Sequence, residues 1–113
     1  MHEDCKIVDE PVRRAEARLP AVPAQVFRLA ALAAPLIRTV AEVSAMTGLP
    51  RAEARAAMED LVDAHLVEAV DIDTYRYTVL IQAIARRRAQ KIEGPERCRA
   101  ALARADRALV AAP

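Results

Sequence analysis

Acidic side chains, rather than a nucleophile or a metal-binding set, are the groups whose spacing indicates a chemical role in this sequence. Apolar residues recur every three or four positions over residues 51–64, and this predicts a helix with one buried face: Ala54, Ala57, Met58, Leu61 and Val62. At about 100° per residue, the opposite face carries small and acidic side chains. We predict that this face binds protein through the following residues: Glu53, Ala56, Glu59, Asp60 and Asp63.

The same helix is the second of a predicted helix-turn-helix. Residues 39–47 favour a short helix, Gly48 ends it, and Pro50 starts the next one. When such a motif reads DNA, the second helix enters the major groove and presents Arg, Lys, Asn or Gln to the bases. Here the corresponding face would bring carboxylates toward phosphates, so binding to nucleic acid is disfavoured.

Direct DNA binding nevertheless stays open as the alternative, because domains of this kind often bind DNA. It would use the cations that could approach the sugar-phosphate backbone: Arg51, Arg55, Arg76, Arg86, Arg87 and Lys91. Arg55 is placed to pair with Glu59 one helical turn away. Arg88 falls among apolar residues of its helix, and we predict that it forms an ion pair with an acid of the same domain.

These groups must be positioned by a mainly helical fold: a winged helix-turn-helix with a small two-stranded β-wing and flanking helices. We expect a tail and short helix at residues 1–20, the winged domain at residues 21–93, and an amphipathic helix at residues 94–113. The wing is predicted from alternating residues 66–70, a turn, and a return strand at residues 75–77.

Prolines and apolar spacing place the remaining helices. Pro11 is expected to open the short helix, and a second helix is expected from Pro23 to about Ala34. The helix that follows the wing, from residue 79 to about 92, has this predicted buried stripe: Leu80, Ile81, Ile84, Ala85 and Ile92.

The last helix carries a narrow apolar seam made of Cys98, Leu102, Ala105 and Leu109. We favour packing of this seam across its own domain. The alternative is pairing with a partner protein or with a second copy as a homodimer, and Leu102 and Leu109 are therefore further candidates for protein binding.

Charge is distributed unevenly along the chain, although the net charge is only +1. Residues 1–38 hold six cations and five anions, residues 39–75 hold two and eight, and residues 76–113 hold nine and three. The acidic middle segment should prefer the basic C-terminal segment, or a basic partner, over phosphate.

Several other functions find no support in the residues. Two distant cysteines do not indicate a disulfide framework or a metal site, and no leader or membrane-spanning run is evident, so we expect a cytoplasmic protein without membrane contact. A chain with only two glycines lacks a phosphate-binding loop, so no nucleotide and no cofactor is predicted. Ser44 has no neighbouring base, and no enzyme activity is expected.

A family resemblance covers about residues 19–107. Residues 61–68, the Tyr75-Arg76-Tyr77 segment and residues 80–89 resemble the winged-helix domain of actinomycete NB-ARC or STAND nucleotide-switch regulators, which are allied to antibiotic regulatory proteins. The resemblance implies a winged helix that lies against a nucleotide domain and senses nucleotide through a histidine after the second wing strand. This chain has Thr78, Val79 and Leu80 in place of the family's His-Asp-Leu, and Thr78 is better placed as a helix N-cap.

Overall fold

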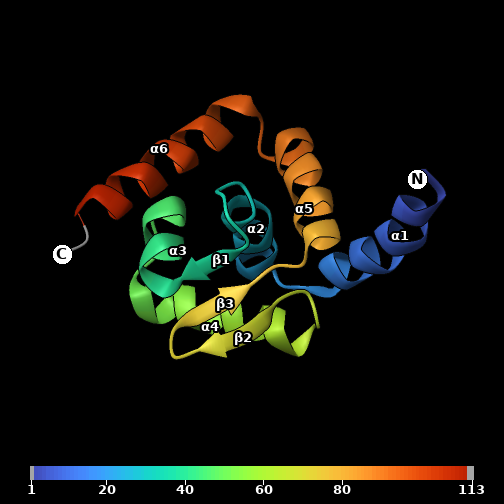
Figure 1. Cartoon of the computed structure of the whole chain (residues 1–113), viewed down its shortest axis with the longest axis horizontal. Coiled ribbons are helices and arrows are strands. Elements are labelled where there is room, and N and C mark those ends of the chain that lie inside the picture. Colours follow the sequence, from blue (N-terminus) through green and yellow to red (C-terminus); the bar gives the residue numbers. More distant parts are fainter. Residues whose placement is uncertain (1, 112–113) are drawn as a thin grey trace.

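The computed structural model describes the backbone of residues 2–111 and the side chains of residues 9–107. Over that range the elements are α1 (His2–Arg18), α2 (Ala21–Ala30), β1 (Ile37–Thr39), α3 (Val40–Thr47), α4 (Arg51–Asp63), β2 (Glu68–Asp71), β3 (Thr74–Arg76), α5 (Val79–Ile92) and α6 (Pro95–Ala111). Figure 1 shows α2 at the centre, α6 lying along α3, and the strands on one side. The predicted mainly helical fold with a small antiparallel sheet is confirmed, and it is compatible with a winged helix carrying flanking helices.

Local capping interactions fix both ends of α3 and the turn that leads into α4. The Thr39 hydroxyl accepts a hydrogen bond from the Glu42 backbone N–H at 3.1 Å, and the Glu42 carboxylate accepts one from the Thr39 N–H at 3.0 Å. Gly48 ends α3 in the left-handed conformation, with φ of 80°. The Ser44 hydroxyl donates to the Leu49 carbonyl at 2.6 Å and fixes the chain as it enters α4.

The sheet has three strands rather than the two predicted for the wing. Their order is β1-β3-β2, all antiparallel, and β1 is the strand that the sequence did not indicate. In the register, Arg38 lies opposite Tyr75, and both side chains are buried, so β1 closes the core side of the sheet. β2 begins at Glu68, later than the predicted start at residue 66, and Leu66 and Val67 pack in the hydrophobic core just before it.

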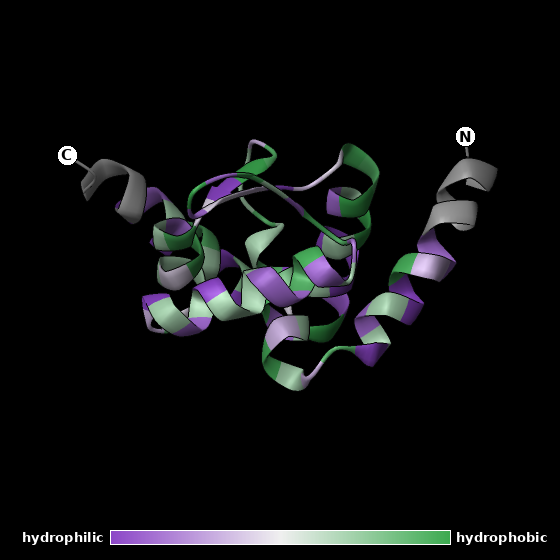
Figure 2. Ribbon diagram, turned by 90° about the horizontal axis from the view of Figure 1, so that it is seen from below, coloured by the Kyte–Doolittle hydropathy of each residue, from purple (hydrophilic) through white to green (hydrophobic). Residues whose placement is uncertain are grey.

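Two hydrophobic clusters form the core. The larger lies among α2, α3, α4, α5 and the inner side of the sheet, with Phe27, Met58 and Tyr77 fully buried. The smaller lies beneath α6, where Cys98, Ala101 and Ala105 pack with Met46 of α3. Figure 2 shows hydrophilic and hydrophobic residues alternating along the helices, as expected where each helix buries one face.

Several predicted helix boundaries and core positions were wrong. α1 begins at His2 and contains Pro11, and α2 ends at Ala30 with Ala34 exposed beyond it. In α5, Leu80 and Ile92 are 42% and 48% exposed. Ile84 and Ala85 are buried as predicted, and Gln82 and Ala89 are the other buried residues of α5.

Gln82 and two arginines are drawn inward by the carbonyl groups at the end of α2. Arg86 donates to the carbonyls of Ala31 and Ala33 at 2.8 and 3.3 Å, and Gln82 donates to Ala33 at 3.1 Å. The fully buried Arg38 donates to the Ala30 carbonyl at 2.5 Å, and burial lowers the pKa of its guanidinium. These donors satisfy carbonyls that the helix leaves without partners.

A network of ion pairs attaches α1 to the rest of the molecule. The buried Glu16 accepts from Arg28 of α2 at 2.7 Å and also pairs with Arg88 of α5. Arg28 in turn pairs at 2.8 Å with Glu93, which also accepts from Arg97 at 3.0 Å. The ion pair predicted for Arg88 is thus present, but its partner lies in the N-terminal helix, outside the 21–93 segment.

Candidate protein-binding site

The outer side of α4 is exposed, as the helical spacing predicted. Ala54, Ala57, Met58 and Leu61 are buried against the core, which turns the opposite side of the helix to solvent. Glu53, Ala56, Asp60 and Asp63 are all exposed there, and we call these four residues the acidic face. Positions three, four and three residues apart lie along one line on a helix. The acidic face is therefore a continuous stripe of three carboxylates with a methyl group between them.

Two shallow grooves border the acidic face, and Asp60 lines both of them. One, of about 320 Å³, lies beside the start of α2 and includes Val22 and Pro23, with Val22 47% exposed. The other, of about 460 Å³, lies beside the end of α1 and includes Leu19 and His65. The surface is therefore apolar between its carboxylates, which suits a helical ligand better than a bare phosphate chain.

Glu59 belongs to a different part of the α4 surface. Its carboxylate accepts a hydrogen bond from the Tyr75 hydroxyl of β3 at 2.5 Å. Burial, together with this bond, raises the pKa of Tyr75 to about 12. Glu59 thus fastens α4 to the sheet, and its role differs from that of the four residues of the acidic face.

The turn of the wing also binds Arg55, a cation of α4, in an ion pair. The predicted pair between Arg55 and Glu59 is wrong, because Arg55 binds Asp73 of the wing turn through two hydrogen bonds of 2.7 and 2.9 Å. The hydrogen bond to Asp73 raises the pKa of Arg55, and the same bond lowers the pKa of Asp73. The wing returns beside α4, so a nonlocal carboxylate reaches Arg55 in better geometry than the local one.

The other candidate DNA contacts do not form one surface. Arg76 lies on the outer face of the sheet and pairs with Glu68 at 3.0 Å, and Arg51 is exposed at the start of α4. Arg86 is held by the α2 carbonyls and does not present its guanidinium freely. Arg87 and Lys91 are exposed on α5, in a groove against α1. The six cations are therefore split between the wing side and the α5 side.

The seam of α6 packs within its own chain, as favoured from the sequence. Cys98 and Ala105 are buried, Leu102 is partly buried against the same cluster, and Arg104 donates to the Met46 carbonyl at the end of α3 at 3.1 Å. Leu102 is therefore largely occupied by internal packing, and the seam up to Ala105 is not open for a homodimer. The side chain of Leu109 lies outside the described residues.

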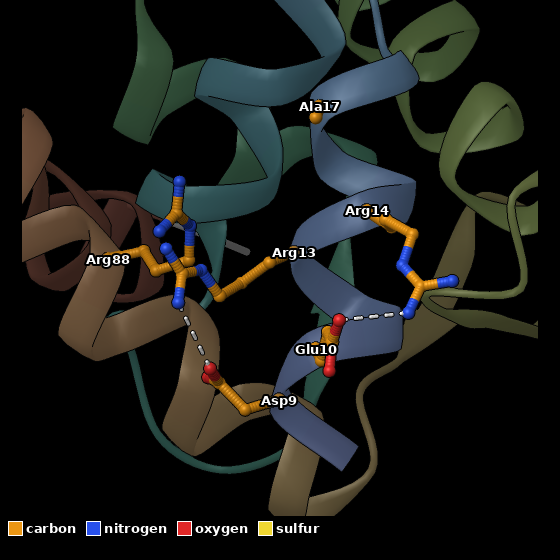
Figure 3. Close-up of a pocket in the computed structure, with 6 residues that line it drawn as sticks. All are labelled: Asp9, Glu10, Arg13, Arg14, Ala17 and Arg88. Carbon is orange, nitrogen blue, oxygen red and sulfur yellow. Dashed lines mark hydrogen bonds and ion pairs between the residues drawn. The ribbon is translucent and has the colours of Figure 1, made fainter. Parts of the chain in front are cut away.

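A further groove, which sequence reasoning did not find, lies between α1 and α5. It has a volume of about 660 Å³ and is lined by Arg13, Arg14, Arg88, Asp9, Glu10 and Ala17. Figure 3 shows Arg13 and Arg88 pointing toward one another from the two helices. The spacing of α5 indicated its cations, but only the tertiary position of α1 shows that Arg13 joins them.

No family model, curated protein or solved structure matches this chain. No helix in the described part of the chain is long and apolar enough to cross a membrane. Among the same residues, no group of three or more His, Cys, Asp or Glu side chains is arranged to hold a metal ion.

Proposed function

We propose that this chain is a non-catalytic winged-helix regulatory module that binds another protein through the acidic face of α4. The observation that supports this most directly is the exposed stripe of Glu53, Asp60 and Asp63 with grooves on both sides. A predominantly acidic surface bordered by apolar grooves is typical of a specific protein contact, and Arg18 is a cation that also lines one of these grooves. The complementary ligand is a basic helix with small apolar residues facing inward.

DNA reading by the same surface is disfavoured by electrostatics. Neutralising the DNA phosphates requires cations, but the acidic face of α4 presents three carboxylates outward and Arg55 is already bound to Asp73. The alternative, a direct DNA-binding transcription factor of the winged-helix class, is favoured only by the fold and by the exposed Arg51 at the start of α4.

The resemblance to STAND regulators gives this module a cellular setting. We infer a role in transcriptional or antibiotic-pathway control, in the cytoplasm, with the winged helix serving as a contact element for another protein. The family's histidine is replaced by Thr78, whose hydroxyl instead accepts from the Ile81 N–H at 3.3 Å and caps α5. Nucleotide sensing through that position is accordingly not part of the proposal.

Site-specific photo-cross-linking in the native cell tests the protein contact. A photoreactive residue at Ala56, in the middle of the acidic face, should form a discrete adduct that Asp60→Lys with Asp63→Lys abolishes. A photoreactive residue at the exposed Ala100 of α6 is the matched control. Equal labelling from Ala56 and Ala100, or an Ala56 adduct that survives the charge reversal, would contradict the proposal.

A titration with DNA distinguishes the protein-binding proposal from the DNA-binding alternative. Duplex DNA binding measured by fluorescence anisotropy should be undetectable at physiological salt. Tight binding that falls steeply with added salt and weakens in Arg51→Ala or Arg76→Ala would instead establish the DNA-binding function.

A further inference from the structure

The groove between α1 and α5 carries the opposite charge to the acidic face. Arg13, Arg14, Arg87, Arg88 and Lys91 line its two adjoining parts, of about 660 and 150 Å³, and we call these five residues the cationic groove. The acids that line the same space are Asp9 and Glu10. Cations therefore outnumber carboxylates along the groove.

Arg14 pairs with Glu10 at 3.1 Å and Arg88 pairs with the buried Glu16, so the uncompensated charge of the cationic groove lies on Arg13, Arg87 and Lys91. Asp9 is shared between Arg13 and Arg87, each at 3.7 Å, and these two arginine side chains are 58% and 66% exposed. Lys91 is exposed and has no ion pair among the described side chains. Long contacts between exposed groups contribute little, so both arginines can turn to a better carboxylate at small cost.

From these two surfaces we infer that the acidic face of one copy docks in the cationic groove of a second copy, head to tail. This rests on the proposed function and identifies the partner of the acidic face as the chain itself. The α4 helix is a ridge between two grooves, and the cationic groove is a trough between two helices, so ridge and trough match in shape as well as charge. Ala56 on the ridge and Ala17 in the trough are small enough for close approach.

The charge distribution favours this arrangement over others between two copies. With a net charge of +1, whole molecules do not repel strongly, whereas two acidic faces or two cationic grooves brought together would. A contact between two different patches builds short chains or a closed ring of copies. One helix in one groove is a small interface, so we expect weak association that weakens further as salt is added.

Sedimentation velocity over a concentration series tests this with a charge-swap design. The wild type should show a sedimentation coefficient that rises with concentration at about 0.01 M salt, where the Debye length is about 30 Å, and much less at about 0.15 M, where it is about 8 Å. Asp60→Lys with Asp63→Lys, and separately Arg87→Glu with Lys91→Glu, should each weaken self-association about tenfold or more. An equimolar mixture of the two variants should associate again, which also shows that both are folded.

Arg99→Glu with Arg107→Glu on α6 makes the same change in net charge as Arg87→Glu with Lys91→Glu, at exposed positions outside the groove, and should leave association intact. A wild type that stays monomeric at low salt, association that survives either reversal, or a mixture that fails to restore it would overturn the inference. Those results leave the proposed function standing, because an Ala56 adduct to a different protein would still support it. Loss of that adduct, in contrast, would remove the proposed function itself.

Discussion

Glu16→Gln should destabilise the fold far more than an equivalent change on the surface of the same helix. Glu16 is 4% exposed and accepts from two guanidinium groups, those of Arg28 and Arg88. Removing one partner from a buried ion pair costs about 3–5 kcal/mol. Arg28 keeps Glu93 at 2.8 Å, and Arg88 is 23% exposed and can reach water, so we reduce the expected loss to about 2–3 kcal/mol. For a domain of this size the midpoint of thermal unfolding should fall by roughly 8–12 °C.

Urea unfolding followed by far-UV circular dichroism measures this loss directly. Glu10→Gln is the matched control, because Glu10 pairs at 3.1 Å with Arg14 on the same helix but the two side chains are 76% and 66% exposed. The control should change the unfolding free energy by about 0.5 kcal/mol or less. Adding Arg88→Met to Glu16→Gln should recover part of the loss, since it removes the cation left without a partner. Equal costs for Glu16→Gln and Glu10→Gln would refute the reasoning.

Other groups give predictions that rest on pH and packing. Burial opposes ionisation of Glu93, but hydrogen bonds led by that from Arg28 hold the pKa of this carboxyl below its ordinary value. The stabilising contribution of Glu93 is therefore complete above the ordinary pKa of a glutamate and is lost as the pH falls through the pKa in the folded protein. The difference in the free energy of unfolding by urea between Glu93→Gln and the wild type should therefore disappear in strong acid. Burial raises the pKa of Tyr75 to about 12 and that of Tyr77 further, so the folded protein should show no tyrosinate absorbance near about pH 10. The unfolded chain does ionise there, so the free energy of unfolding should decline as the pH rises past about 10. Tyrosinate absorbance that appears near about pH 10 in the folded protein would contradict the burial argument. Arg38→Ala should cost about 2–4 kcal/mol in urea unfolding, and Arg38→Met less, because methionine fills the volume without burying a cation; the reverse order would be evidence against this account.

The parts of the fold that the sequence predicted are those fixed by local periodicity. The buried side of α4 and the turn at Gly48 follow from spacing and capping over a few residues, and both are present. In α5, periodicity placed Leu80 and Ile92 inside, where the structure exposes them. Which side of α5 is buried depends on the end of α2. The backbone carbonyls there need hydrogen-bond donors, and polar side chains of α5, about fifty residues away in sequence, supply them.

The candidate site divides in the same way. Exposure of the acidic face was predictable, since a helix with one buried side must turn the other to solvent. The partner of Arg55 was not, because Asp73 reaches it only once the wing has folded back. The cationic groove was equally hidden, since it forms between two helices that are about seventy residues apart in the sequence. β1 was too short and too polar at Arg38 to be recognised as a strand.

The ion-pair network connects stability to both proposed surfaces through α1. The middle of this helix contributes Asp9 and Arg13 to the cationic groove. Arg18 at its end, and Leu19 just after it, line the groove beside the acidic face. Glu16 lies between these segments and holds the helix to α2 and α5. A change that loosens Glu16 should therefore weaken head-to-tail association even though neither surface has lost a charge. In an Asp60→Lys/Asp63→Lys background, the change at Glu16 should weaken association no further, because the contact through the acidic face is already lost.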